Sequence, residues 1–481
     1  MKISSTLKFF LIVVASLMLL CVVFPRNGVK LFGVTLHFPK LHEVLVREKE
    51  KDMDDLIVHK KHRDFTGVRD SIEDCYHALF EGPTRFWLPD DDVSSFDKFF
   101  RSAEKAESQK RTVRVMHYGD SQIEQDRITC RIRELLQAKF GGGGPGMLPL
   151  RQPVATITFS QSSSGSLIGQ STWGDSTFVR AAGNYGPMLR SWRLTGTATL
   201  SLSAVNNKNA TERVGHFSSV RVLFNNRPGP LAISMRNRKG AGNFSETVTS
   251  QGIHEIAWRL DSNTTSAALT FNGTADIYGI MVDDGYGVAV DNIGMRSTSG
   301  HQFRMVDFDM LKESYRILDV GMIIMQFGGN SATYLKTQDA INKYCNQIGK
   351  QIDYVHSACP DAAILFVGPS DMSTMVNGKL ATLPMLPTLI HCLCDTVTAH
   401  GAAFWSIYDA MGGKNSMVVW NKNGYAGADY VHFSIKGAAL MGDYLGESIL
   451  KLYELYYLRR KLTSDEFSRI WKEIKDKTPK Q

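Results

Sequence analysis

Four short apolar segments constrain the fold of this 481-residue chain more than any other feature. Each is rich in strand-forming residues and is ended by Gly, Pro, Asn or Asp, and helix-like stretches occur between them. They read VRVMHYG, GMIIMQFGG, AAILFVGPS and AAFWSIYDA, beginning at residues 113, 321, 362 and 402. Parallel strands need long crossover connections, usually helices. The alternation therefore predicts an α/β fold built on a parallel sheet.

The connection between the first two segments is far too long for one crossover helix. Residues 155–283 instead hold short apolar or alternating runs, such as ATLSLSAV, SVRVLFNN and IHEIAWRL, which are separated by Asn, Gly, Pro and Ser turns. An inserted all-β sandwich is the simplest account. Exposed aromatic and asparagine side chains there would suit a sugar, although packing and turns are the commoner roles of such residues.

The N-terminus differs in composition from the rest. Lys2 and Lys8 precede an uncharged apolar run from Phe9 to Phe24. The sixteen residues of this run lie between the length of a signal-peptide core and that of a full membrane span. No small-x-small cleavage pattern follows. We therefore expect an uncleaved signal anchor with the remainder exported, and a cleaved signal peptide is the alternative.

These patterns divide the chain into five parts. In chain order they are a signal anchor (1–27), a membrane-proximal stalk with a helical lead-in (28–110), an α/β core in two pieces (111–154 and 284–458), the inserted β domain (155–283) and a charged tail (459–481). Because the anchor precedes the core, we expect the core in the cell envelope, on the periplasmic or extracellular side.

Composition limits the partners. The formal charge of +7 is mild for this length, and Lys and Arg are spread among acidic residues, so no nucleic-acid partner is expected. The seven cysteines lack the spacing of a disulfide framework, and mostly free, buried thiols are expected. The segment HCLCD, which begins at His391, lacks a second ligand pair at zinc spacing, so neither a metal nor a cofactor is expected. The oligomeric state is left open.

A serine stands where the first apolar segment gives way to a helix. Ser121 follows that segment, and the stretch from Ile128 to Phe140 then has apolar residues at helical spacing until Gly141 stops it. In a parallel sheet, ligands bind beyond the carboxyl ends of the strands. The Ser121 hydroxyl would be exposed there beside a free backbone N–H, although the position by itself also suits a helix cap.

Partners for this serine occur at other strand ends. Asn330 follows the second apolar segment, directly after Gly328 and Gly329. Asp429 and His432 lie three residues apart, just before the last amphipathic helix. Serine, histidine and aspartate are the components of nucleophilic acyl transfer, in which the imidazole takes the serine proton, the carboxylate orients the imidazole, and N–H groups hold the oxyanion.

Together these motifs resemble the SGNH/GDSL hydrolase family over residues 113–452. The matching blocks, in family order, are GDS ending at Ser121, VDNIGMRSTSG containing Gly294, GGN ending at Asn330, and DYVH ending at His432. Each block is weak by itself, but four in family order at strand ends are specific. Gln122 stands where the family has leucine, which puts the substrate-facing surface in question more than the chemistry.

The resemblance implies a three-layer, flavodoxin-like hydrolase core and a set of roles. Ser121 would be the nucleophile, His432 the base and Asp429 its orienting group. The backbone N–H groups of Ser121 and Gly294 and the side-chain amide of Asn330 would form the oxyanion hole. Gly294 is the least secure of these assignments, because several other glycines lie nearby.

A β domain inserted in such a core, combined with export, also resembles bacterial peptidoglycan O-acetylesterases, in which a carbohydrate-binding-module-like domain interrupts the hydrolase. We therefore expect a membrane-anchored serine esterase that removes O-acetyl groups from a glycan through an acyl-enzyme. An O-acetyltransferase, a lipase or thioesterase, and a non-catalytic glycan-binding protein with the same core are the alternatives.

Overall fold

The computed structural model describes residues 66–174, 178–205, 207, 210–237 and 243–477, together with short pieces before residue 37. It divides into two units, residues 1–68 and 69–481. In the first, β1 (Val29–Leu31) and β2 (Val34–Leu36) pair antiparallel. Most of the predicted signal anchor, and residues 37–65 of the predicted stalk, lie outside the described residues. Among the helices that are described, none has the length and apolar character needed to cross a bilayer.

The second unit is built around a six-stranded sheet. Its strands, in spatial order, are β13 (Gly287–Gly294), β4 (Thr112–Gly119), β14 (Val320–Gln326), β15 (Ala363–Gly368), β18 (Ala403–Ser406) and β3 (Phe86–Trp87). The first five run parallel, and β3 pairs antiparallel with β18. When the five parallel strands are numbered by their order in the chain, their spatial order is 2-1-3-4-5, which is the flavodoxin-like order. The predicted fold class is confirmed, and β13 is the parallel strand that the apolar segments did not reveal.

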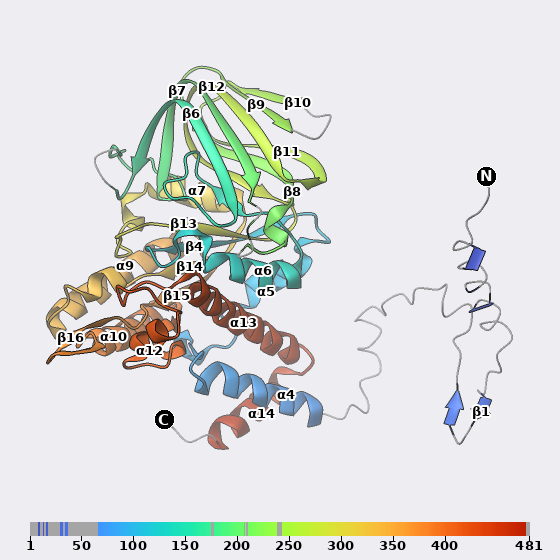
Figure 1. Ribbon diagram of the computed structural model, residues 1–481, viewed down its shortest axis with the longest axis vertical. Coiled ribbons are helices and arrows are strands. Elements are labelled where there is room, and N and C mark those ends of the chain that lie inside the picture. The colour runs from blue at the N-terminus through green and yellow to red at the C-terminus, as the bar shows by residue number, and fades with distance from the viewer. Residues whose placement is uncertain are drawn as a thin grey trace. The chain divides into compact units, whose positions relative to one another are not determined.

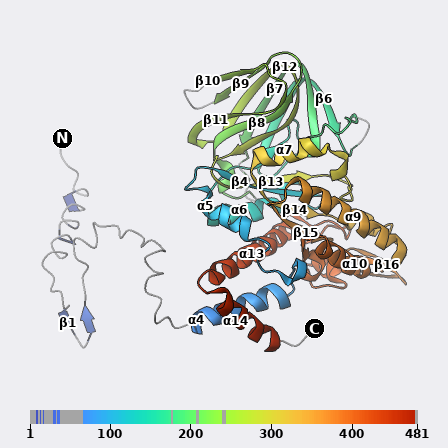
Figure 2. The ribbon, with the colours of Figure 1, turned by 180° about the vertical axis from the view of Figure 1, so that it is seen from behind.

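Helices cover both faces of this sheet (Figure 1, and from behind in Figure 2). One face carries α5 (Asp97–Ala106), α6 (Thr129–Phe140) and α13 (Ile435–Arg459). The other carries α7 (Phe308–Leu318), α9 (Gln338–Ala358) and α10 (Leu386–Ala399). Alternate strand residues such as Tyr118 and Phe366 join the apolar stripes of the second group in one core, because successive strand side chains point to opposite faces.

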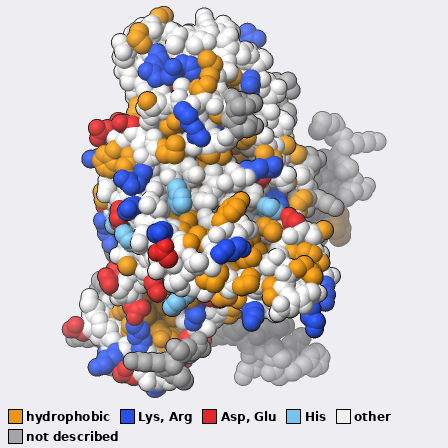
Figure 3. Space-filling view, turned by 90° about the vertical axis from the view of Figure 1, so that its left-hand side faces the viewer, with side chains coloured by type: hydrophobic (Ala, Val, Ile, Leu, Met, Phe, Trp, Pro, Cys, Tyr) orange, Lys and Arg blue, Asp and Glu red, His pale blue; other side chains and the backbone are white. Residues whose placement is uncertain are grey.

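Shorter elements complete the unit. They are α4 (Thr66–Tyr76), α8 (Gly329–Ala332), α11 (Ile407–Ala410), α12 (Ser416–Lys422), α14 (Ser464–Lys477) and the hairpin of β16 (Ser373–Val376) with β17 (Lys379–Thr382). Helix α14 lies in the predicted charged tail, where Trp471 packs edge-on against Tyr76 of α4. On the face shown in Figure 3, basic and acidic side chains are interspersed with apolar and uncharged ones.

Close packing of α13 on α6 positions the chain segment before α13. A Cβ at Gly442 would lie 2.5 Å from the Ile128 carbonyl oxygen, and one at Gly446 would lie 2.6 Å from the Leu135 side chain. Only glycine allows helices to approach this closely. The Ser434 side chain caps α13 by accepting from the Gly437 N–H at 3.2 Å. The residues just before this cap are thereby held beside the start of α6.

The connection from β4 to β13 contains the inserted β domain. Its strands are β5 (Gly146–Leu148), β6 (Phe159–Ser171), β7 (Arg190–Ala204), β8 (Phe217–Asn226), β9 (Leu231–Asn237), β10 (Asn243–Val248), β11 (Gly252–Thr264) and β12 (Ser266–Asp283). All pairings are antiparallel, and β12 joins them around one apolar core because its partners change from β7 and β9 to β5 and β8 along its length. The domain begins at β5, somewhat before residue 155.

A buried network of charges joins the core sheet to the inserted domain. The guanidinium of Arg114 on β4 donates to Asp291 on β13 at 2.6 Å and to Asp283 on β12 at 2.7 Å. Arg221 on β8 donates to Asp283 at 3.0 Å. Burial opposes ionisation of Asp283, but Arg221 and Arg114 outweigh it and lower the pKa of Asp283 to about 2. The network fixes the inserted domain against the strand that leads to Ser121.

Candidate active site

Ser121 lies two residues beyond the end of β4, which is flanked by β13 and β14. Ligands of flavodoxin-like folds bind at this point, where the strand order reverses. The chain turns sharply after Gly119. A Cβ at that position would lie 3.0 Å from the Ile123 side chain and 3.1 Å from the Gln326 carbonyl oxygen, so a glycine suits this crowded turn. The turn leaves Ser121 in the lining of a cavity of about 460 Å³.

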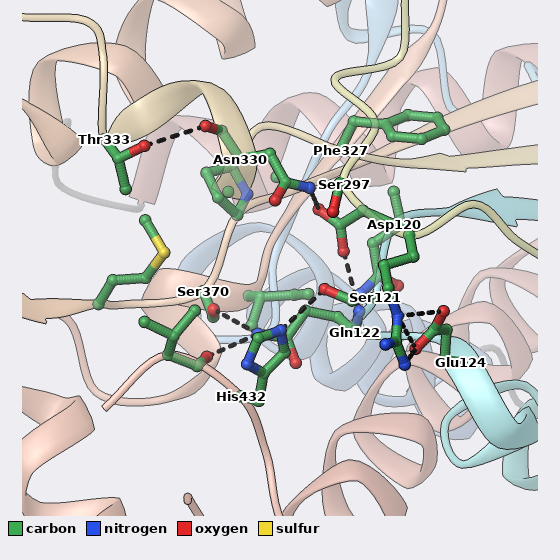
Figure 4. A pocket seen from close by; sticks show the side chains of 18 of the residues that line it. Asp120, Ser121, Gln122, Glu124, Ser297, Phe327, Asn330, Thr333, Ser370 and His432 are labelled. Atoms are coloured by element: carbon green, nitrogen blue, oxygen red, sulfur yellow. Dashed lines mark hydrogen bonds and ion pairs between the residues drawn. The ribbon is translucent and has the colours of Figure 1, made fainter. Parts of the chain in front are cut away.

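The structure brings Ser121, His432 and Asp429 into one hydrogen-bonded series. Ser121 Oγ lies 2.8 Å from His432 Nε2 (Figure 4). His432 Nδ1 lies 2.7 Å from Asp429 Oδ2. Asp429 Oδ1 accepts from the backbone N–H groups of Val431 and His432 at 3.0 and 3.1 Å. Burial opposes its charged form, but the hydrogen bond from the His432 side chain and these backbone bonds outweigh it, so the pKa of Asp429 lies below its ordinary value. Such a series can move the serine proton to the imidazole.

Gln122 connects the serine segment to the histidine segment. Its side-chain amide donates to the Val431 carbonyl oxygen at 2.7 Å and to Ser370 Oγ at 3.2 Å, and its side-chain oxygen accepts from the Phe433 N–H at 3.3 Å. Arg127 adds a second connection by donating to the Phe433 carbonyl oxygen at 2.9 Å. The backbone on both sides of the histidine is therefore fastened to residues that adjoin the serine.

Asp120 and Asn330 meet on the other side of the serine. Asn330 Nδ2 donates to Asp120 Oδ2 at 3.3 Å and to the Thr298 carbonyl oxygen at 2.9 Å, and Asp120 Oδ1 accepts from the Gln122 N–H at 2.9 Å. Burial raises the pKa of Asp120 to about 6. A buried carboxylate thus sets the orientation of the amide that the sequence assigns to the oxyanion hole.

Gly294 lies apart from this group. It ends β13 opposite Gly119 and lines a separate small pocket at the base of the inserted domain. Pairing with β4 continues one residue further, because the Met295 N–H donates to the Gly119 carbonyl oxygen at 2.7 Å. The chain therefore leaves the sheet only after Met295, and it is Arg296 and Ser297 that line the serine cavity. The predicted oxyanion role of Gly294 finds no support in this position.

Ser297 has the conformation expected of a glycine at this point. Its φ of 61° lies in the left-handed region that L side chains rarely adopt. Among the described residues, its backbone N–H makes no hydrogen bond. A backbone N–H in the lining of the cavity, held by a strained turn, can donate to a ligand.

Opposite ends of the cavity carry different side chains. At one end Arg296 pairs with Glu124 through bonds of 3.0 and 2.7 Å. At the other lies Thr333, in the segment that follows α8, and the next residue, Tyr334, also lines the cavity. Figure 4 shows Thr333 and Glu124 on opposite sides of Ser121. The cavity therefore extends well beyond the serine in two directions.

Sequence reasoning found the serine, histidine, aspartate and asparagine but missed several neighbours. The bonds of Gln122 and Asp120 join segments far apart in the chain, which no local pattern reveals. The sequence does not reveal the left-handed backbone of Ser297 either, although Ser297 lies in the VDNIGMRSTSG block, shortly after Gly294. Among the missed cavity residues, Tyr334 is the one that its position close after Asn330 could have indicated.

The fold has known relatives among solved structures. No family model matches the sequence, and no curated protein matches it. A peptidoglycan O-acetylesterase structure matches with a TM-score of 0.59 and 20% identity, covering 76% of this chain and 98% of that one. A carbohydrate esterase of family two with its carbohydrate-binding domain, from Corynascus thermopiles (Myceliophthora fergusii), matches with a TM-score of 0.28 and 10% identity, covering 60% of this chain and 99% of that one.

A GDSL-like lipase structure from Bacteroides ovatus also matches, with a TM-score of 0.26 and 10% identity, covering 62% of this chain and 98% of that one. The peptidoglycan O-acetylesterase match, which spans nearly the whole of the other chain, shows the shared fold. The protein therefore has the fold of a peptidoglycan O-acetylesterase, and its motifs resemble those of the SGNH/GDSL hydrolases.

Proposed function

We propose that this protein is a serine esterase that removes O-acetyl groups from a glycan of the cell envelope. One observation carries the proposal, namely the continuous hydrogen-bonded series from Ser121 through His432 to Asp429 at a cavity beyond the strand ends. The fold shared with a peptidoglycan O-acetylesterase supports it and makes peptidoglycan the first glycan to test.

Acylation begins when Ser121 Oγ attacks the carbonyl carbon of the ester. The hydroxyl proton passes to His432 Nε2, 2.8 Å away, and Asp429 holds Nδ1 of the imidazolium that forms. The tetrahedral intermediate collapses when the bond to the sugar oxygen breaks. His432 returns the proton to that oxygen, which leaves a free sugar hydroxyl and an acetyl group on Ser121.

Deacylation repeats these steps with water as the nucleophile. His432 takes one water proton while the hydroxide attacks the acetyl-serine, and it then returns the proton to Ser121 Oγ as acetate leaves. The enzyme is regenerated with no net change in its protonation. Ester and water are converted to alcohol and acetic acid, which ionises in solution.

The negative oxygen of each intermediate needs donors close by. We assign this role to the backbone N–H groups of Ser121 and Ser297 and to Asn330 Nδ2. The Asn330 amide is held by the Thr298 carbonyl oxygen at 2.9 Å, whereas its bond to Asp120 is longer, at 3.3 Å. The hydrogen that faces Asp120 is the one to be shared with the oxyanion. Preorganised donors of this kind contribute roughly 100- to 1,000-fold to turnover.

The location proposed for the enzyme follows from its N-terminus. The apolar run after Lys8 would anchor the chain in the membrane and leave the catalytic unit on the periplasmic or extracellular side, where an envelope glycan is accessible. The inserted β domain would then face the same compartment as the cavity.

The test is acetate release by the purified full-length chain. Substrates are p-nitrophenyl acetate, butyrate and octanoate, and O-acetylated peptidoglycan. Ser121→Ala removes the nucleophile, and Ser108→Ala is the matched control, because Ser108 is an exposed serine bonded only to the Lys105 carbonyl oxygen. We expect acetyl esters to be cleaved best, Ser121→Ala to be inactive and Ser108→Ala to behave as the parent.

Other outcomes would reject the proposal. Preference for octanoate would identify a lipase or thioesterase. Transfer of acetyl groups to an added glycan in place of release as acetate would identify a transferase. Equal activity of Ser121→Ala and the parent would show that the series of Ser121, His432 and Asp429 does not carry out the reaction.

A further inference from the structure

Tyr334 is the most exposed large apolar side chain among the described residues, at 81% of its full accessible area. An exposed aromatic ring beside a cavity offers a ligand a large apolar surface to cover. Tyr334 lines the same cavity as Ser121. Within the described part of the chain, its ring stacks on no other aromatic side chain and its hydroxyl makes no hydrogen bond.

The position of Tyr334 is fixed relative to the reacting groups. Its backbone N–H donates to the Ser331 carbonyl oxygen at 2.9 Å, which continues the turn of α8, and Thr333 Oγ1 donates to the Asn330 carbonyl oxygen at 3.1 Å. The next residue, Leu335, packs against the apolar core. The backbone that carries the Tyr334 ring is thus held close to Asn330, and the ring itself is free to turn toward a ligand.

The size of the cavity exceeds the needs of an acetyl group. A volume of about 460 Å³ falls within the range of roughly 300–1,000 Å³ typical of sites that enclose a whole small molecule. The ion pair of Arg296 with Glu124 lies at the opposite end from Thr333. The Tyr334 end therefore has room for a group beyond the one that carries the ester.

We propose that Tyr334 stacks on a sugar ring that adjoins the acetylated sugar, so that the enzyme acts on glycan chains of at least two sugars. A sugar ring has an apolar face of C–H groups and a polar edge, and an aromatic ring with a polar tip matches both. This inference rests on the proposed esterase function and names the part of the substrate that its cavity recognises. Binding energy gained at Tyr334 would place the ester beside the oxyanion donors.

The experiment compares chain lengths. The kcat/KM of the full-length chain is measured on the O-acetylated monomer and trimer of N-acetylglucosamine and on p-nitrophenyl acetate, for the parent and for Tyr334→Ala. Val419→Ala, an exposed apolar side chain on α12 that does not line the cavity, is the control. We expect the parent to prefer the trimer to the monomer by about tenfold and Tyr334→Ala to lose that preference, while Val419→Ala keeps it.

A binding measurement separates this inference from the esterase function. Calorimetric titration needs no turnover. The trimer of N-acetylglucosamine without O-acetyl groups is titrated into Ser121→Ala and into the double variant Ser121→Ala/Tyr334→Ala. We expect the double variant to bind the trimer about tenfold more weakly. Equal binding by the two proteins would overturn the role of Tyr334 even if acetate is released. A larger effect of Tyr334→Ala on p-nitrophenyl octanoate than on the trimer would also overturn it, because the ring would then contact an acyl chain.

Discussion

The side-chain amide of Gln122 donates a hydrogen bond of 2.7 Å to the carbonyl oxygen of Val431, the residue before His432. The same side chain accepts from the N–H of Phe433, the residue after His432, at 3.3 Å. The histidine is therefore held from both sides by the residue that follows the serine. Gln122, which stands where the family has leucine, thus makes the contact that joins the serine segment to the histidine segment.

Replacing Gln122 by leucine should lower kcat by about tenfold, because both bonds beside His432 are lost and roughly 1–3 kcal/mol accompanies a buried polar group left unpaired. The effect should fall on kcat and leave KM nearly unchanged, since the imidazole acts in the transition state. Steady-state kinetics on p-nitrophenyl acetate, with thermal unfolding as a check on folding, measure this. A variant that loses thermal stability while keeping kcat would show that Gln122 only supports the fold.

Asp120 should link stability and activity to pH. A rise in its pKa from the ordinary 3.8 to about 6 corresponds to about 3 kcal/mol, which the charged form costs the folded protein at pH 7. The folded state binds this proton more tightly than the unfolded state. The cost is therefore absent below about pH 4, grows as the pH rises from about 4 to 6, and is complete above about pH 6.

Asp120→Asn, which cannot ionise, should accordingly gain most stability relative to the parent at pH 7, and the difference should shrink between pH 6 and pH 4. The same variant should be a weaker enzyme, because an amide has one acceptor oxygen in place of two and cannot accept from both the Asn330 amide and the Gln122 N–H. Urea unfolding at a series of pH values and the pH profile of kcat/KM test the two statements. A stability difference that is independent of pH would contradict the titration of Asp120 in this range.

The left-handed conformation of Ser297 distinguishes its backbone from its side chain. Ser297→Gly keeps the N–H and relieves strain of about 1 kcal/mol, so the thermal midpoint should rise slightly. Ser297→Pro removes the N–H and cannot adopt a φ of 61°, and kcat should be roughly 100- to 1,000-fold below that of the glycine variant. Similar kcat values in the two variants would exclude this N–H from the oxyanion hole.

The buried Arg114 should matter far more to stability than the partly exposed Arg111, which directly precedes the same strand. Arg114→Met leaves Asp283 and Asp291 without a shared partner, at a cost of about 3–5 kcal/mol. The control is Arg111→Met, because Arg111 pairs with Asp319 where both are partly exposed and such a pair contributes about 0–1 kcal/mol. Urea unfolding followed by circular dichroism compares the two. Equal losses would mean that the network between the core and the inserted domain carries no special weight.

Local patterns predicted much of this protein. The apolar segments at residues 113, 321, 362 and 402 became β4, β14, β15 and β18, and the long stretch between the first two became antiparallel strands. Such patterns succeed because the side-chain periodicity and turn residues of each element are read within a few neighbouring positions. Strand β13 escaped notice because it includes two polar residues, the buried Asp291 and the half-buried Asn292, whose partners lie on other elements.

The sequence by itself determined most of the strands and helices and indicated the candidate catalytic side chains, because each depends on a short run of residues. Only the tertiary structure decided how those side chains are supported. Three hydrogen-bonded pairs join residues that are far apart in the chain, and they are Gln122 with Val431, Asp120 with Asn330, and Arg114 with Asp283. These bonds exist only once the sheet order and helix packing are set. The same packing moved the exposed backbone N–H from Gly294 to Ser297, since strand pairing continues through Met295 before the chain turns into the cavity.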